Sequence, residues 1–155
     1  MARDNPLLGI ELWPLLEGME MRKRWSIYAE WLHRAYEDNL EMRLKKALVT
    51  REVKGVLRRL NAKNQGQSAR ALAKIAHHNP CVVFNIAIGQ VMSYDNLADP
   101  LMEALRTLTS IGYDILTFSL LDAFSQPDRP RMKDDGTNVS HWLQSSSDFR
   151  TVSRY

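Results

Sequence analysis

The side chains that most often carry out chemistry in proteins are sparse in this 155-residue sequence. Its four histidines are scattered except for one adjacent pair, His77 and His78. Neighbouring residues point about 100° apart on an α-helix, so this pair is poorly placed to chelate one metal ion. Asp134 and Asp135 make up only half of a cation site, and adjacent acids in a polar loop are usually solvated. We therefore expect no metal site.

Cys81 is the single cysteine of the sequence. An intramolecular disulfide is excluded, and a reducing compartment, the cytosol or the nucleus, fits best. The residue falls in the first turn of an expected helix, where a thiolate is favoured. Its aliphatic neighbours favour another interpretation, in which Cys81 is a small core residue without a chemical role.

Known catalytic motifs are missing. The sequence has no glycine-rich phosphate loop, no paired-cysteine zinc spacing, no Gly-x-Ser-x-Gly turn and no His-Glu-x-x-His pair. We therefore expect a protein that is not an enzyme, with no catalytic residues and no cofactor.

A basic stretch is the one feature that predicts binding. Residues 43–74 hold ten basic side chains and one acidic side chain, a net charge of +9 in a chain whose total is +3. On a helix, Arg51, Lys54 and Arg58 share a face, and Arg59 adjoins it. These four residues are candidate contacts to nucleic acid, by phosphate neutralisation, or to an acidic partner. A solvated helix face and salt bridges to another subunit are the alternatives.

Apolar residues recur at intervals near 3.6, which predicts helices at 6–17, 20–38 and 40–61. Pro6 after Asn5 marks the first start, and Pro14 is expected to bend or end that helix. The second helix carries a stripe expected in the core: Trp25, Tyr28, Trp31, Leu32 and Tyr36. The third carries an expected apolar side: Leu44, Leu48, Val53, Val56, Leu57 and Leu60.

The next two helices are expected at 68–76 and 80–93. Ser68 is the expected cap of the first. Asn79 followed by Pro80 is a strong start signal for the second, which is apolar nearly all round and should be buried on several sides. Asp99 followed by Pro100 repeats this signal.

Gly112 is the expected carboxyl cap of the helix that begins near 99, and a further buried helix is expected at 113–124. An exposed loop should follow at 126–137, and then a last helix from about Asn138 that has no stop signal before Tyr155. We therefore expect one helical domain over residues 1–155, as part of a larger helical scaffold. The fold class is all-α, with stacked antiparallel helices similar to an α-solenoid, although no sequence repeat is present. The longest apolar stretch is too short for a membrane span.

Several ordered segments resemble the THO complex subunit 2 family. Together they cover roughly residues 25 to 150, in the family's order and with similar spacing. Pro14, the break containing Gly66 and the glycine at 112 depart from the family pattern and affect only local helix ends. The matching segments are Tyr28-Ala29-Glu30-Trp31, His78-Asn79-Pro80, Tyr94-Asp95-Asn96-Leu97, Leu108–Leu116, Arg131-Met132-Lys133 and Trp142-Leu143-Gln144-Ser145.

The resemblance implies a specific role. Members of this family are long, nuclear, α-helical scaffolds of the THO part of the transcription–export assembly, without catalytic residues. The expected partners are other THO complex subunits and the DEAD-box RNA helicase of that assembly, and RNA through the basic 43–74 face is the alternative. A helical adaptor of the translation or RNA-processing type is the structural lookalike that pattern alone leaves open.

Overall fold

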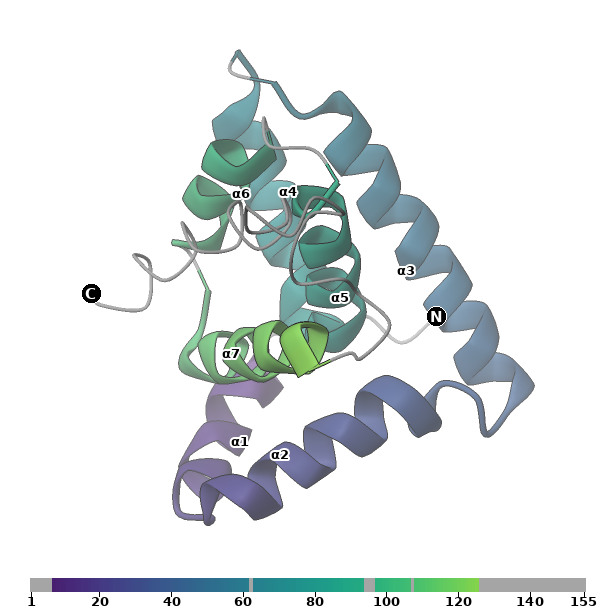
Figure 1. Ribbon diagram of the computed structural model, residues 1–155, viewed down its shortest axis with the longest axis vertical. Helices are drawn as coiled ribbons and strands as arrows, with labels where there is room; N and C mark the ends of the chain where they lie inside the picture. Colours follow the sequence, from purple (N-terminus) through teal and green to yellow (C-terminus); the bar gives the residue numbers. More distant parts are fainter. Residues whose placement is uncertain (1–6, 62, 94–96, 107, 126–155) are drawn as a thin grey trace, which may run out of the picture.

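The computed structural model describes residues 7–61, 63–93, 97–106 and 108–125. Within these ranges every regular element is helical, which confirms the all-α prediction (Figure 1). The elements are α1 (Leu7–Glu17), α2 (Met21–Glu30), a π-helical turn η1 (Trp31–Ala35), α3 (Leu40–Arg59), α4 (Gln65–His78), α5 (Pro80–Val91), α6 (Ala98–Leu105) and α7 (Ser110–Ser125).

Helices α3 to α6 run alternately up and down, as a stack of antiparallel helices requires (Figure 1). The α3–α4 and α4–α5 links are short, and short links place consecutive helices side by side. Helix α5 packs against α3, α4 and α7. Helix α7 lies across the lower end of this stack, and α1 and α2 pack against α7 on its other side.

The predicted aromatic stripe lies in the core. Tyr28, Leu32 and Tyr36 are buried, and Trp25 and Trp31 are partly buried against the same cluster. The helix that carries them widens into the π-helical turn from Trp31 onward. The indole Nε1 of Trp31 donates to the Tyr36 hydroxyl at 3.1 Å, and that hydroxyl donates to Asn79 Oδ1 at 3.4 Å. This chain of polar contacts joins η1 to the start of α5.

The predicted apolar side of α3 is correct only in part. Val53, Val56 and Leu57 are buried, but Leu44 and Leu48 are 58% and 44% exposed. Leu44 and Val53 are nine residues apart, and at about 100° per residue they lie on opposite sides of the helix. The predicted apolar side therefore combined residues from two faces. Val49, which was not in the predicted set, is the buried residue one turn before Val53.

Two predicted helix ends are wrong. The amide of Ser68 donates to the Asn64 carbonyl at 2.9 Å, so Ser68 already lies inside α4 and its side chain is buried. Gly112 does not cap the end of a helix. It lies in the first turn of α7, where its amide reaches Thr109 Oγ1 at 3.4 Å. A β-carbon at Gly112 would lie 3.4 Å from atoms of Leu108 and Thr109, which is an ordinary van der Waals contact.

The start and burial of α5 are as predicted, but the capping bond expected of Asn79 and an end of α1 at Pro14 are not found. Helix α5 begins at Pro80 and is buried on most sides, and Cys81 is a fully buried core residue. The Asn79 side chain makes no capping bond to the helix, because it accepts from Tyr36 instead. Pro14 lies inside α1 without ending it. The predicted start at Asn5 and Pro6, the 126–137 loop and the helix from Asn138 lie outside the described residues.

Candidate partner-binding surface

The solvent-facing side of α3 forms a continuous ridge with two chemically different halves. Asn39 starts the helix by accepting a hydrogen bond from the Met42 amide at 2.8 Å. At about 100° per residue, one strip of the helix then faces away from the buried valines. We define this α3 ridge as Leu40, Leu44, Ala47, Leu48, Arg51, Lys54 and Arg58, all of which are exposed.

The first half of the α3 ridge is apolar. Leu40 is 80% exposed, and it is followed at intervals of four residues by the exposed Leu44 and Leu48. Three leucines in a row on a solvent-facing helix side are unusual, because a helix surface in water normally carries polar residues there. The sequence contains this signal, but the apolar spacing predicts a core position for Leu44 and Leu48 and says nothing of Leu40. These leucines are the part of the candidate site that sequence reasoning missed.

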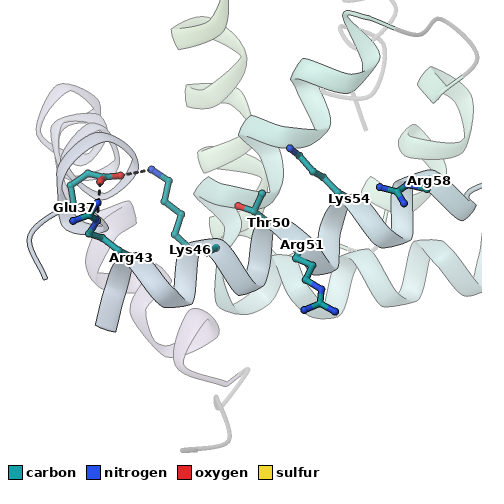
Figure 2. Close-up of a pocket in the computed structure, with 8 residues that line it drawn as sticks. Glu37, Arg43, Lys46, Thr50, Arg51, Lys54 and Arg58 are labelled. Carbon is teal, nitrogen blue, oxygen red and sulfur yellow. Dashed lines mark hydrogen bonds and ion pairs between the residues drawn. The ribbon is translucent and has the colours of Figure 1, made fainter. Parts of the chain in front are cut away.

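The second half of the ridge is cationic and borders a shallow groove of about 630 Å³ (Figure 2). Arg51, Lys54 and Arg58 follow one another along α3, with Arg51 directed to one side of the helix and Lys54 to the other in this view. Within the described part of the chain, none of the three has an ion-pair or hydrogen-bond partner. The groove is lined by Glu37, Arg43, Lys46, Ala47, Thr50, Arg51, Lys54 and Arg58.

Glu37 offsets the positive charge beside the leucines. Its carboxylate accepts a hydrogen bond from Lys46 Nζ at 2.7 Å and lies 3.8 Å from Arg43 Nε. The hydrogen bond from Lys46 lowers the pKa of Glu37 below its usual value. One carboxylate offsets only one of these two cations, so the groove keeps one positive charge beside the leucines and three more at Arg51, Lys54 and Arg58.

Arg59 does not join this row. Its Nε donates to the Gly55 carbonyl at 3.0 Å, and the residue lines a separate cavity of about 260 Å³ between α3 and α4. Arg70 and Lys74 are exposed on α4 and do not line the groove of the α3 ridge. The 43–74 stretch is thus divided between surfaces, and the structure brings together three of the four predicted contacts.

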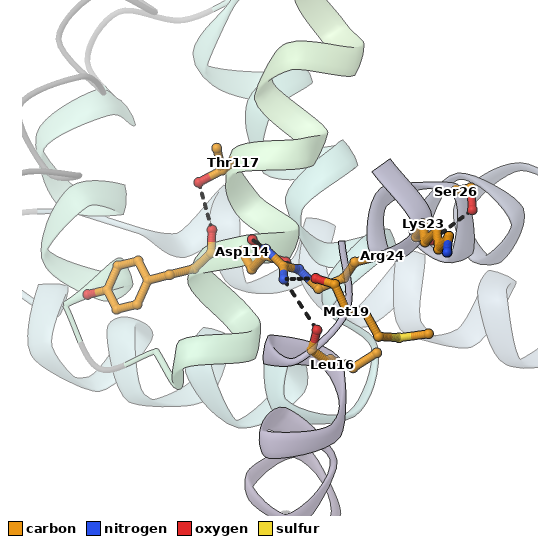
Figure 3. A network of polar contacts seen from close by, with 8 residues as sticks. Leu16, Met19, Lys23, Arg24, Ser26, Asp114 and Thr117 are labelled. Carbon is orange, nitrogen blue, oxygen red and sulfur yellow. Dashed lines mark hydrogen bonds and ion pairs between the residues drawn. The ribbon is translucent and has the colours of Figure 1, made fainter. Parts of the chain in front are cut away.

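A polar network holds α1 and α2 against α7 (Figure 3). Arg24 donates from Nε to Asp114 Oδ2 at 2.5 Å and from Nη2 to Oδ1 at 3.1 Å. Its Nη1 also lies 3.3 Å from the carbonyls of Leu16 and Met19, at the end of α1. The hydrogen bond to Asp114 raises the pKa of Arg24, which keeps the guanidinium charged. Arg24 thereby joins three helices through one side chain.

A second cavity, of about 410 Å³, lies between α1, α2 and the start of α7. Its lining is mainly apolar, with Leu12, Ile27 and Trp31 among the residues that face it and His77 and His78 at its edge. None of the described residues that line it is an acid. The cavity has the character of a packing groove.

The described residues hold no cluster of three or more histidine, cysteine or acidic side chains that could bind a metal ion. Burial raises the pKa of the Cys81 thiol to about 12, so the group stays protonated and poorly nucleophilic. None of the described helices is both long enough and apolar enough to cross a membrane. The chemistry that this arrangement supports is surface recognition through leucines and cations.

Comparison with known proteins gives consistent matches along the chain. The family model "THO complex subunit 2 N-terminus" matches residues 1–70, and "Transcription- and export-related complex subunit" matches residues 72–147. The human and Arabidopsis thaliana proteins called THO complex subunit 2 are each 32% identical over 145 residues, 94% of this chain. The Saccharomyces cerevisiae protein of that name is 27% identical over 149 residues. The chain spans only 9%, 8% and 9% of these three relatives.

Proposed function

The chain belongs to the THO complex subunit 2 family, and from this membership we propose that it is a non-enzymatic scaffold segment of the nuclear THO complex. In this role it holds other THO subunits and the DEAD-box RNA helicase, and so helps to couple transcription to messenger RNA processing and export. The observation that carries the proposal is the match to the family over almost the whole chain.

The exposed apolar surface supports a scaffold role. Besides the leucines of the α3 ridge, α1 exposes large apolar side chains on several sides of a short helix. Large apolar patches on a protein surface usually mark contacts with other polypeptide. The exposed large apolar residues of α1 are Leu7, Ile10, Leu12 and Leu15.

Co-purification tests the proposal. The protein is tagged at its own locus, isolated from nuclear extract and analysed by mass spectrometry for THO subunits and the helicase. We expect recovery of these proteins in constant ratios across preparations, and an untagged strain provides the background. A folded protein that recovers none of the THO subunits above this background would refute the scaffold proposal.

RNA binding through the cationic half of the α3 ridge is a second candidate, supported by the net charge of +9 over residues 43–74. Phosphate contacts release counterions, so such binding weakens steeply with salt. Charge reversal at Arg51, Lys54 and Arg58 should then lower both the RNA affinity and its salt slope. An unchanged affinity and slope would exclude this candidate.

A further inference from the structure

We infer that the α3 ridge is a docking surface for an amphipathic helix of a protein partner, one that presents an apolar row followed by acidic side chains. This inference rests on the proposed function and adds to it the surface and the chemistry of the partner. The observation behind the inference is that three exposed leucines are followed along the same side of α3 by three cations that have no partner among the described residues.

The apolar half has the dimensions of a helix–helix contact. Leu40, Leu44 and Leu48 span about 12 Å, or roughly two turns, at a rise of 1.5 Å per residue. Rows spaced by four residues form the ridges that pack into the grooves of another helix. An extended peptide would instead pair with a strand edge, and the described part of the chain has no strand.

The cationic half sets the charge of the partner. Arg51, Lys54 and Arg58 extend the ridge over about 10 Å, and no acid in the described residues pairs with them. Glu37 meanwhile holds Lys46 and Arg43 beside the leucines. A partner helix therefore meets an apolar surface with little net positive charge first and a more strongly positive surface beyond it, which favours acids at one end of its apolar row.

A protein helix explains both halves of the ridge, and RNA explains only one. RNA phosphates form favourable electrostatic contacts with the cations, but the leucines add nothing to the affinity for RNA. No aromatic residue lies on the ridge to stack on a base. The apolar side chains lose their exposure to water only against another apolar surface. The leucines thus favour a polypeptide.

Two variant sets and a photocrosslink test the inference in the protein tagged at its own locus. The first set is Leu44→Ser with Leu48→Ser, and its control is Leu121→Ser on α7, where the leucine is 48% exposed. The second is Arg51→Glu with Lys54→Glu, and its control is Arg70→Glu with Lys74→Glu, which lie in the same basic stretch but outside the groove. We expect each ridge pair to lower recovery of at least one THO subunit about tenfold or more, and the controls to retain it.

The photocrosslink identifies the partner segment without weakening the surface. Leu40, the most exposed leucine, is replaced by p-benzoylphenylalanine, and Leu121 carries the same replacement as control. We expect a crosslink to a helical segment of a THO subunit with an apolar row and at least two acids within the next turns. Crosslinks to RNA, or to the same segment from both positions, would overturn the inference.

The experiments distinguish a failure of the docking surface from a failure of the proposed function. If wild-type protein recovers the THO subunits and both ridge variants recover them equally well, the docking surface is refuted and the proposed function stands. If wild-type protein recovers none, the proposed function itself fails. If only the charge variant loses its partner and that partner is RNA, the ridge binds nucleic acid and the inference of a protein helix is wrong.

Discussion

Arg24 on α2 and Asp114 on α7 form a two-pronged ion pair between residues 90 positions apart in the sequence. Both side chains are largely buried, at 13% and 15% exposure. The same guanidinium lies above the Trp13 ring at 5.6 Å and contacts the carbonyls that end α1. Because one residue satisfies all these groups, the position of α1 and α2 on the stack depends on it.

Replacing Asp114 with Asn should destabilise the protein. The change leaves the partly buried Arg24 charge without its carboxylate, and a loss of a charged, mostly buried hydrogen-bonded pair costs about 2 kcal/mol. Chemical denaturation measures the free energy of unfolding. The matched control is Arg34→Ala, which removes an exposed pair with Glu30 at 3.8 Å and should cost under about 0.5 kcal/mol. Equal losses in the two variants would contradict the role of Arg24.

Asn39 should be needed to keep the apolar half of the α3 ridge helical. Its side chain caps the first turn of α3, and loss of such a cap costs about 1 kcal/mol. Asn39→Ala should lower the free energy of unfolding by that amount and speed amide hydrogen exchange near Leu40. Asn39→Asp keeps an acceptor at this position and should stay close to wild type. Unchanged exchange in the Ala variant would show that packing alone fixes this end of α3.

Two glycines in helices should respond oppositely to a larger side chain. A β-carbon at Gly89 in α5 meets no atom within 4 Å, so Gly89→Ala should stabilise the protein by up to about 1 kcal/mol through helix propensity. Gly112 is buried and a β-carbon there would already touch Leu108 and Thr109, so the γ-carbons of Gly112→Val should destabilise the protein by about 1–3 kcal/mol. Thermal unfolding of the two variants, compared with wild type, checks both predictions. A stabilising effect of Val at 112 would contradict the described packing.

The Cys81 thiol should be inert until the protein unfolds. Burial raises its pKa from 9.0 to about 12, so the unfolded state loses this proton first as the pH rises. The free energy of unfolding should therefore be unaffected below about pH 9 and should fall between pH 9 and 12. Burial of Tyr36 raises its pKa to about 12 and adds to this fall. Labelling with a thiol reagent at pH 8 should follow the unfolding rate, and immediate labelling of native protein would contradict burial.

Much of the fold was predictable because its strongest signals are local. The Asn79–Pro80 start and the apolar sequence after it predict a buried α5, and α5 lies at the centre of the stack. The helix ends predicted at Ser68 and Gly112 are wrong because serine and glycine are common at helix ends, yet here both are buried residues inside α4 and α7. The Arg24–Asp114 pair was not predictable, since its partners meet only through the packing of α2 on α7.

The candidate surface was predictable in part. Arg51, Lys54 and Arg58 share a side of α3 because their spacing fixes their direction on any helix. Leu44 and Leu48 were assigned to the core because hydrophobicity alone does not say which of two apolar sides faces inward. The buried Val49 and Val53 settle that choice, and they turn the leucines to solvent.

The proposed function requires that this chain holds THO subunits by protein contacts. Recovery of these subunits with the tagged protein, measured by quantitative mass spectrometry with and without nuclease treatment of the extract, tests it most directly. We predict equal recovery in both samples, because leucine contacts between polypeptides do not depend on nucleic acid. Loss of the THO subunits after nuclease treatment would contradict this requirement and show that nucleic acid bridges them to the chain.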